Sequence, residues 1–175
     1  MNNKILSLGL AISQVIRSFL IFILIVLIIL GGILIVNHEA LPFLKYDAGS
    51  FIFSSENTPN QGFRPEGWFM FILFSKLALS VACSVLILTE AIKVINSLKS
   101  VDTFKKENIK AFRKMGYVFI ALFSIHMFAV DQNPEGFELR LSIPLNYLLA
   151  VLGCFILAEI FKEGNKLMEE SKLTI

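Results

Sequence analysis

Residues 18–36 read SFLIFILIVLIILGGILIV, nineteen residues without a charged side chain. An α-helix rises about 1.5 Å per residue, so about 20 such residues cross the ~30 Å hydrocarbon core of a bilayer. The run is longer than the roughly 7–15 residues of a signal-peptide core, and no small-residue cleavage pattern follows Val36. The stretch therefore predicts a retained membrane-spanning helix.

The composition of the whole chain supports the same class. Of 175 residues, 55% are hydrophobic and 17% are charged, and the mean hydropathy is +0.72. A soluble domain carries roughly 25% charged residues, and a disordered chain is poor in the Leu, Ile and Phe that dominate here. The net charge of +2 argues against binding nucleic acid over a broad basic face. We expect an integral membrane protein that binds no nucleic acid directly.

Four apolar segments predict one membrane domain over residues 1–175, an all-α antiparallel bundle of four transmembrane helices. The predicted spans are residues 18–36, 68–88, 113–130 and 142–161. The segments around them are an outer loop at 37–67, a cytoplasmic connection at 89–112, an outer turn at 131–141 and a cytoplasmic tail at 162–175. In the outer loop, residues 50–54 suggest a short extended piece.

Basic residues are divided unevenly between the two sides of this bundle. The N-terminal stretch, residues 89–114 and the tail together carry twelve Lys and Arg, whereas the two outer connections carry three. Basic residues favour the cytoplasmic side of a membrane. Both termini are therefore predicted to be cytoplasmic, and a three-span arrangement, which would put the basic tail opposite the basic connection, is rejected.

Lys76 is a charged residue inside the second predicted span, about 12 Å from its outer end. A charge at this depth usually faces the bundle interior or a water-filled cavity. His126 and Asn146 lie at a similar predicted depth, so Lys76, His126 and Asn146 form a candidate intramembrane polar pocket. In the alternative interpretation, Lys76 extends to the outer headgroups and His126 lies at the interface.

Small residues recur at helical spacing in two of the spans. The second span has Ser80, Cys83 and Ser84 on the face of Lys76, and the fourth has Ala150, Gly153, Cys154 and Ala158. Small side chains let membrane helices approach closely. This pattern predicts that the second and fourth spans pack against each other.

Two cytoplasmic stretches carry motifs. Residues 104–116 read FKKENIKAFRKMG, and residues 161–175 read FKEGNKLMEESKLTI. They resemble the patterns F-T-x-E-N-x-x-x-L-x-x-x-G and F-x-x-G-x-x-L-x-x-E-x-x-L-T-I of the bacterial membrane-protein family catalogued as domain of unknown function 2975. The second pattern is matched at every position, whereas Lys105 stands where the first prefers Thr or Ser. The resemblance covers roughly residues 15–175.

This resemblance implies a multi-pass protein of the bacterial inner membrane without an established activity. Genes of this family resemble those that commonly lie beside a gene for a very small helix-turn-helix transcriptional regulator. The association implies a candidate partner, a small cytoplasmic DNA-binding regulator, but no mechanism.

The motifs also have a physical interpretation. Asp102 or Thr103 is placed to cap a helix, Glu107 suits the dipole of its first turn, and Gly164 suggests a helix stop. We expect the two stretches to fold against each other, with Glu169 or Glu170 facing Lys105, Lys106 or Lys110. The candidate cytoplasmic docking surface comprises Phe104, Glu107, Asn108, Arg113, Gly164, Leu167, Glu170, Leu173, Thr174 and Ile175.

The sequence contains no motif of a known enzyme class, and two histidines are too few for a multi-histidine metal or haem site. The prediction is therefore a non-enzymatic accessory or regulatory protein without a cofactor, which contacts the lipid bilayer and is compatible with homo-oligomers. Two alternatives stay open: an immunity or envelope-stress protein acting through the outer loop, and a small transporter that uses Lys76 or Glu159.

Overall fold

The computed structural model describes residues 3–36, 44–47, 50–53, 67–99, 104–133 and 136–173. These residues form four helices: α1 (Asn3–Val36), α2 (Gly67–Lys99), α3 (Lys106–Met127) and α4 (Leu145–Leu173). They also form two antiparallel hairpins, in which β1 (Leu44–Asp47) pairs with β2 (Ser50–Phe53), and β3 (Phe128–Asn133) pairs with β4 (Gly136–Leu141). The protein is predominantly helical, in agreement with the all-α expectation, and it adds two short hairpins that this expectation did not include.

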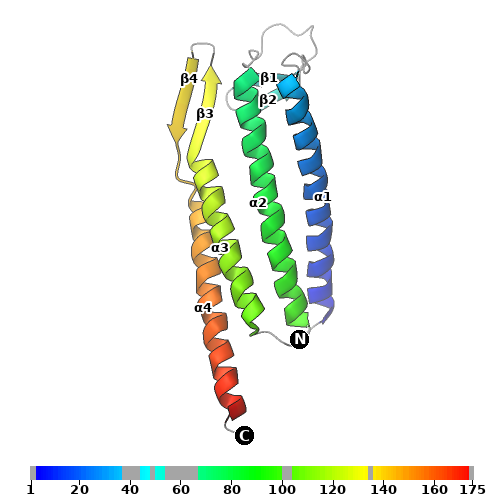
Figure 1. The fold of residues 1–175 in the computed structure, drawn as a ribbon, viewed down its shortest axis with the longest axis vertical. Coiled ribbons are helices and arrows are strands. Elements are labelled where there is room, and N and C mark those ends of the chain that lie inside the picture. The colour runs from blue at the N-terminus through cyan, green and yellow to red at the C-terminus, as the bar shows by residue number, and fades with distance from the viewer. Residues whose placement is uncertain are drawn as a thin grey trace.

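The four helices lie side by side in chain order, each antiparallel to the one before it (Figure 1). Helix α2 packs against α1 and α3, whereas within the described residues α4 packs mainly against α3. The prediction that the second and fourth spans pack together is therefore wrong. Gly153, one of the small residues behind this prediction, has no atom of another described helix within 4 Å of where a Cβ would stand.

Helix α4 meets α3 through a different set of residues. A Cβ at Gly116 would lie 3.0 Å from Cζ of Phe155, so the absence of a side chain lets this ring approach α3. Ala158, one turn further on, is buried. The close approach of α3 and α4 thus depends on a glycine in α3 and on a ring in α4.

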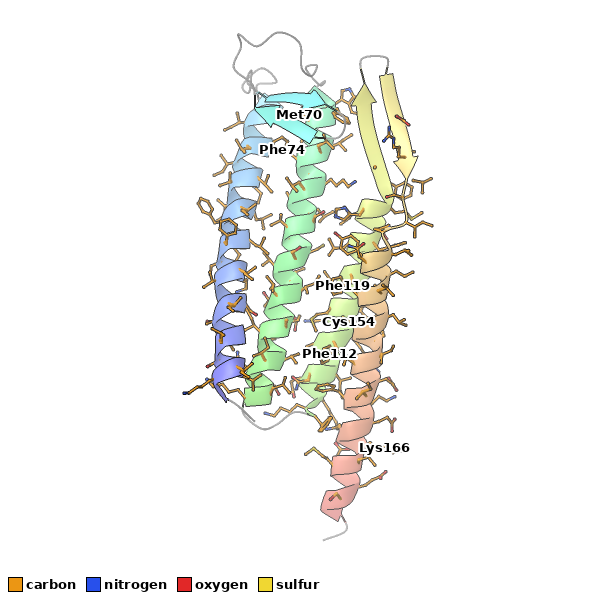
Figure 2. All side chains as sticks on the ribbon, turned by 180° about the vertical axis from the view of Figure 1, so that it is seen from behind. Met70, Phe74, Phe112, Phe119, Cys154 and Lys166 are labelled. Carbon is orange, nitrogen blue, oxygen red and sulfur yellow. The ribbon has the colours of Figure 1, made fainter. Side chains whose placement is uncertain are left out.

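Among the described residues, three helical segments are long and apolar enough to cross a membrane, which indicates a membrane protein. They are Lys4–Ile33, Trp68–Lys99 and Leu145–Ser171. Large apolar side chains are exposed along α1, α2 and α4, as expected for surfaces that face lipid (Figure 2). Helix α3 differs because Lys110, Arg113 and Lys114 confine its apolar part to the stretch from Met115 to Met127.

Several predicted boundaries change in the structure. Helix α3 ends at Met127, so residues 128–130 of the predicted third span belong to β3, and the predicted outer turn is a hairpin. Helix α2 continues to Lys99, into the first half of the predicted connection, and α4 continues through Gly164, which is not a helix stop. The N-cap of α3 is Lys105, without a side-chain cap, rather than Asp102 or Thr103.

A small hydrophobic core joins α2, α3 and α4 in the half of the molecule near the start of α3. Its centre is Val94, Ala111 and Met115. The partly buried side chains around this centre are Ile87, Ala91, Leu98, Phe112, Phe119 and Cys154, of which the last three are labelled in Figure 2. This core holds three helices together near the cluster of motif residues.

Candidate functional site

The start of α3 and the end of α4 meet in a contact that we call the inner junction, formed by Phe104, Phe112, Phe161, Gly164 and Asn165. The Asn165 Nδ2 donates a hydrogen bond to the Phe104 carbonyl oxygen at 2.6 Å. The Phe161 ring lies 5.5 Å from the ring of Phe104 and 5.0 Å from that of Phe112, measured between centroids. The expected contact between the two motif stretches is present.

The absence of a side chain at Gly164 leaves the space that the Phe104 ring occupies in the inner junction. A Cβ at Gly164 would overlap Cδ1 and Cε1 of Phe104. The ring therefore lies directly on the backbone of α4, and any side chain at residue 164 would displace it. This packing explains why a glycine stands in the interior of a helix, where it costs about 1 kcal/mol relative to alanine.

Asn108 ties α3 to α2 beside the inner junction. Its side chain is almost fully buried, at 2% exposure, and its Nδ2 donates a hydrogen bond to Ser97 Oγ at 2.9 Å. A buried amide without partners would cost several kcal/mol, so this bond is needed for the close approach of the two helices.

Ion pairs surround the same region. Lys106 Nζ lies 3.2 Å from Glu169 Oε1, which is one of the pairings expected from the sequence. Lys114 Nζ lies 3.4 Å from Glu90 Oε1, and Arg113 lies 3.7 Å from Glu159 Oε2. Most of these groups are about half exposed or more, so each pair contributes little, typically about 0–1 kcal/mol. These ion pairs therefore favour one alignment of the three helices but contribute little to the free energy of unfolding.

The remaining motif residues point away from the inner junction. Glu107 is exposed in the first turn of α3. Leu167 is 65% exposed, and Glu170 lies 4.0 Å from Lys166 on the same face of α4. Leu173 is the last residue of α4, and Thr174 and Ile175 lie outside the described residues. The predicted docking surface thus divides into a packed part and an exposed part.

At the other end of α3, the structure brings two residues of the predicted polar pocket, Lys76 and His126, to the end of the helix. Lys76 Nζ donates to the Phe128 carbonyl oxygen at 2.8 Å. His126 Nε2 lies 3.2 Å from Ser80 Oγ, and its ring stacks on Tyr147 with centroids 5.1 Å apart. Asn146 is exposed near the start of α4, and a pocket that includes all three residues stays a prediction.

Lys76, Ser80, His126 and Tyr147, which we call the Lys76 cluster, lie at the end of α3 and have a structural role there. Because the chain turns from helix to strand, the last carbonyl groups of α3 lack their helical partners. Ser142 donates from its backbone nitrogen to the Met127 carbonyl at 2.9 Å and from Oγ to the His126 carbonyl at 3.2 Å. With Lys76 on the next carbonyl, that of Phe128, three successive acceptors are satisfied. Sequence reasoning missed Ser142 and Tyr147, since neither belongs to a recognisable motif.

A cleft of about 300 Å³ lies below this cluster, between α2, α3 and α4. Its lining residues are Ser80, Val81, Ser84, Ile87, Leu88, Phe119, Leu122 and Tyr147. The lining is mainly apolar, and the Ser80 and Ser84 hydroxyls already donate to backbone carbonyls of α2. Within the described residues, no group of three or more His, Cys, Asp or Glu side chains is placed to hold a metal ion.

Together, the apolar helices and the packed motif residues define a helical membrane protein. In it, the inner junction joins the start of α3 to the end of α4. The family described as "Protein of unknown function (DUF2975)" matches residues 52–175, and the chain belongs to this family. Comparison with curated proteins and with solved structures finds no match. The residues that carry the family resemblance include four that pack α2, α3 and α4 together: Phe104, Asn108, Phe161 and Gly164.

Proposed function

We propose that this protein is a non-enzymatic accessory or regulatory protein of the bacterial inner membrane, with four spans and cytoplasmic termini. The uneven distribution of Lys and Arg supports this orientation. The pairs Lys114–Glu90 and Arg113–Glu159 lie at one level of α2, α3 and α4, as expected where helices leave the hydrocarbon. In this arrangement the apolar stretch from Met115 to Met127 is the third span.

The observation that carries the docking proposal is the end of α4, which extends beyond the other helices (Figure 1). The contact of Phe104 with Gly164 and Asn165 fixes the base of this extension. Beyond it, Leu167 and Met168 are exposed apolar side chains among charged ones. A helix held at its base with apolar side chains exposed suits a partner that offers a groove. The partner we propose is the small helix-turn-helix regulator implied by the family resemblance.

Cysteine accessibility tests the topology. Single cysteines near Lys105 and at Ile175 should react with a membrane-impermeant maleimide only after the cells are opened. Cysteines near Asn57 and Asn133 should react in intact cells. These residues lie in the two connections with few Lys and Arg, and such connections favour the outer side of the membrane. Cys83→Ser and Cys154→Ser provide the background. An accessible C-terminus in intact cells would contradict the four-span arrangement.

Co-purification with the regulator encoded by the neighbouring gene tests the docking surface. Deletion of residues 171–175, or the single change Leu167→Asp, should leave membrane insertion intact and abolish retention of the regulator. Glu163→Ala, an exposed change on α4 just before the base of the extension, is the matched control and should retain it. If the Leu167→Asp protein keeps the regulator, or if the unaltered protein never binds it, the docking proposal is wrong and the topology is unaffected.

No observation on the described residues favours either of the two alternative functions. The transporter interpretation needs Lys76 or Glu159 to bind a transported species, yet Lys76 caps α3 and Glu159 pairs with Arg113 and Lys162. The immunity interpretation depends on the outer loop 37–67, of which the structure describes only β1, β2 and Gly67. We therefore propose only the docking function.

A further inference from the structure

The hairpin of β3 and β4 has one apolar and one polar face. In its register Phe128 lies opposite Leu141 and Val130 opposite Leu139, so these four residues share a face. Phe128 is 49% exposed, and Leu139 and Leu141 are each 64% exposed. Ala129 and Arg140 lie opposite each other on the other face, where Arg140 pairs with Glu138 at 2.9 Å. The register also places Gln132 and Phe137 on the first face, nearer the tip, so the apolar part of this face is its base, Phe128, Val130, Leu139 and Leu141.

This apolar face continues the lipid-facing surface of α4. The chain leaves β4 at Leu141 and enters α4 at Leu145, and Ile143, Leu145 and Leu149 are all exposed large apolar residues. Exposed apolar side chains therefore run from the hairpin into the helix, and the polar residues in this stretch are Ser142, which is engaged in capping α3, and Asn146.

Measured from the level of the Lys114–Glu90 and Arg113–Glu159 pairs, the outer ends of α3 and α4 stop short of the outer edge of the hydrocarbon core, whereas α2 continues past Lys76 to Gly67. Fourteen residues separate Lys76 from Glu90, Lys114 from Phe128, and Leu145 from Glu159. Each interval spans about 21 Å of helix, about 9 Å less than the ~30 Å hydrocarbon core. Three strand residues at about 3.3 Å each supply the missing length. The segments Phe128–Val130 and Leu139–Leu141 carry that many residues, and their apolar side chains share one face.

Backbone polar groups near lipid need partners, since the hydrocarbon offers none. At the base of the hairpin, Lys76 and Ser142 supply donors to the carbonyls of His126, Met127 and Phe128. Pairing between β3 and β4 satisfies groups on their facing edges. Arg140 and Glu138, on the opposite face, stay away from the acyl chains in this arrangement.

We propose that the apolar face of the β3–β4 hairpin, formed by Phe128, Val130, Leu139 and Leu141, is a lipid-binding surface. It contacts the outer acyl chains and headgroup boundary, and it completes the passage of the α3–α4 half through the outer leaflet. The partner is the phospholipid bilayer itself. This proposal rests on the membrane-spanning arrangement and is independent of the docking surface on α4.

Tryptophan fluorescence in vesicles tests this surface. Trp68 is the single tryptophan of the chain, so Trp68→Phe gives a silent full-length background. Leu139→Trp and Arg140→Trp then place a probe on adjacent residues that belong to opposite faces. In phosphatidylcholine vesicles with brominated acyl chains, the Leu139→Trp protein should lose most of its emission, and iodide on both sides should quench it little. The Arg140→Trp protein should show the reverse.

Leu141→Trp is a second probe on the same face, nearer the base of the hairpin. It should be quenched more strongly than Leu139→Trp by bromine placed deep in the acyl chain. Equal quenching of Leu139→Trp and Arg140→Trp by iodide would overturn the proposal. So would protection of the Leu139→Trp probe from both quenchers, because another protein segment would then cover the face.

Discussion

The Gly164→Val protein is expected to lose about 3 kcal/mol of stability and to release the end of α4 from α3. The new side chain would occupy the space of the Phe104 ring, which cannot easily move aside. Asn165 holds the Phe104 carbonyl, and Phe161 packs against the ring. The helix beyond residue 164 makes few other contacts, so the strain is relieved by detachment of this end rather than by rearrangement of the core.

Gly153→Val is the matched control, since Gly153 is also a glycine inside α4 but has open space where a Cβ would stand. Its effect should lie within about 0.5 kcal/mol, as for most exposed substitutions. Unfolding in mixed detergent micelles measures both variants, and amide hydrogen exchange of residues 162–173 reports the detachment. The added change Phe104→Ala should restore part of the loss in Gly164→Val, and no recovery would contradict the contact.

The sequence alone was sufficient to predict the apolar helices and the family, but it misjudged Gly164. A glycine after a helical motif is a common stop signal. Here the packing of Phe104 requires a residue without a side chain, and this tertiary contact overrides the local preference. The sequence analysis expected the two motifs to fold against each other. It did not identify Gly164 as the residue on which the Phe104 ring packs.

The end of α3 was misjudged for a different reason. Phe128, Ala129 and Val130 continue the apolar run of the helix, so hydrophobicity alone cannot distinguish strand from helix there. One signal was present further along, because Leu139 and Leu141 alternate with Glu138 and Arg140 at the two-residue period of a strand. That alternation, together with the outer turn predicted at 131–141, was the signal for a hairpin.

The partner of Lys76 could not be deduced from sequence. Motif reasoning pairs side chains with side chains, and it therefore grouped Lys76 with His126 and Asn146. The acceptor in the structure is the carbonyl oxygen of Phe128, which becomes available because α3 ends one residue earlier. Where a helix ends inside an apolar run, its last carbonyl groups need hydrogen-bond donors from elsewhere. The position of that end cannot be deduced from the residue types alone.

Replacement of the buried amide that joins α2 and α3 is expected to have the other large effect. Asn108→Asp keeps the shape of the side chain but removes the Nδ2 donor and places a carboxylate where only 2% of the residue is exposed. A buried charge costs up to about 3–5 kcal/mol, and a hydrogen bond from the Ser97 hydroxyl and the dipole at the start of α3 offset part of this cost. The neutral change Asn108→Ala should cost less, roughly 1–3 kcal/mol, from the lost hydrogen bond and the space left behind.

The difference between these two variants isolates the cost of the charge, and it should shrink at acidic pH, where the new carboxyl group is protonated and neutral. Asn146→Ala is the control for loss of an exposed amide and should be close to neutral. Combining Asn108→Ala with Ser97→Ala should cost less than the sum of the two single changes, because both remove the same bond. Additive losses, or equal losses at residues 108 and 146, would show that this hydrogen bond does not join α2 to α3.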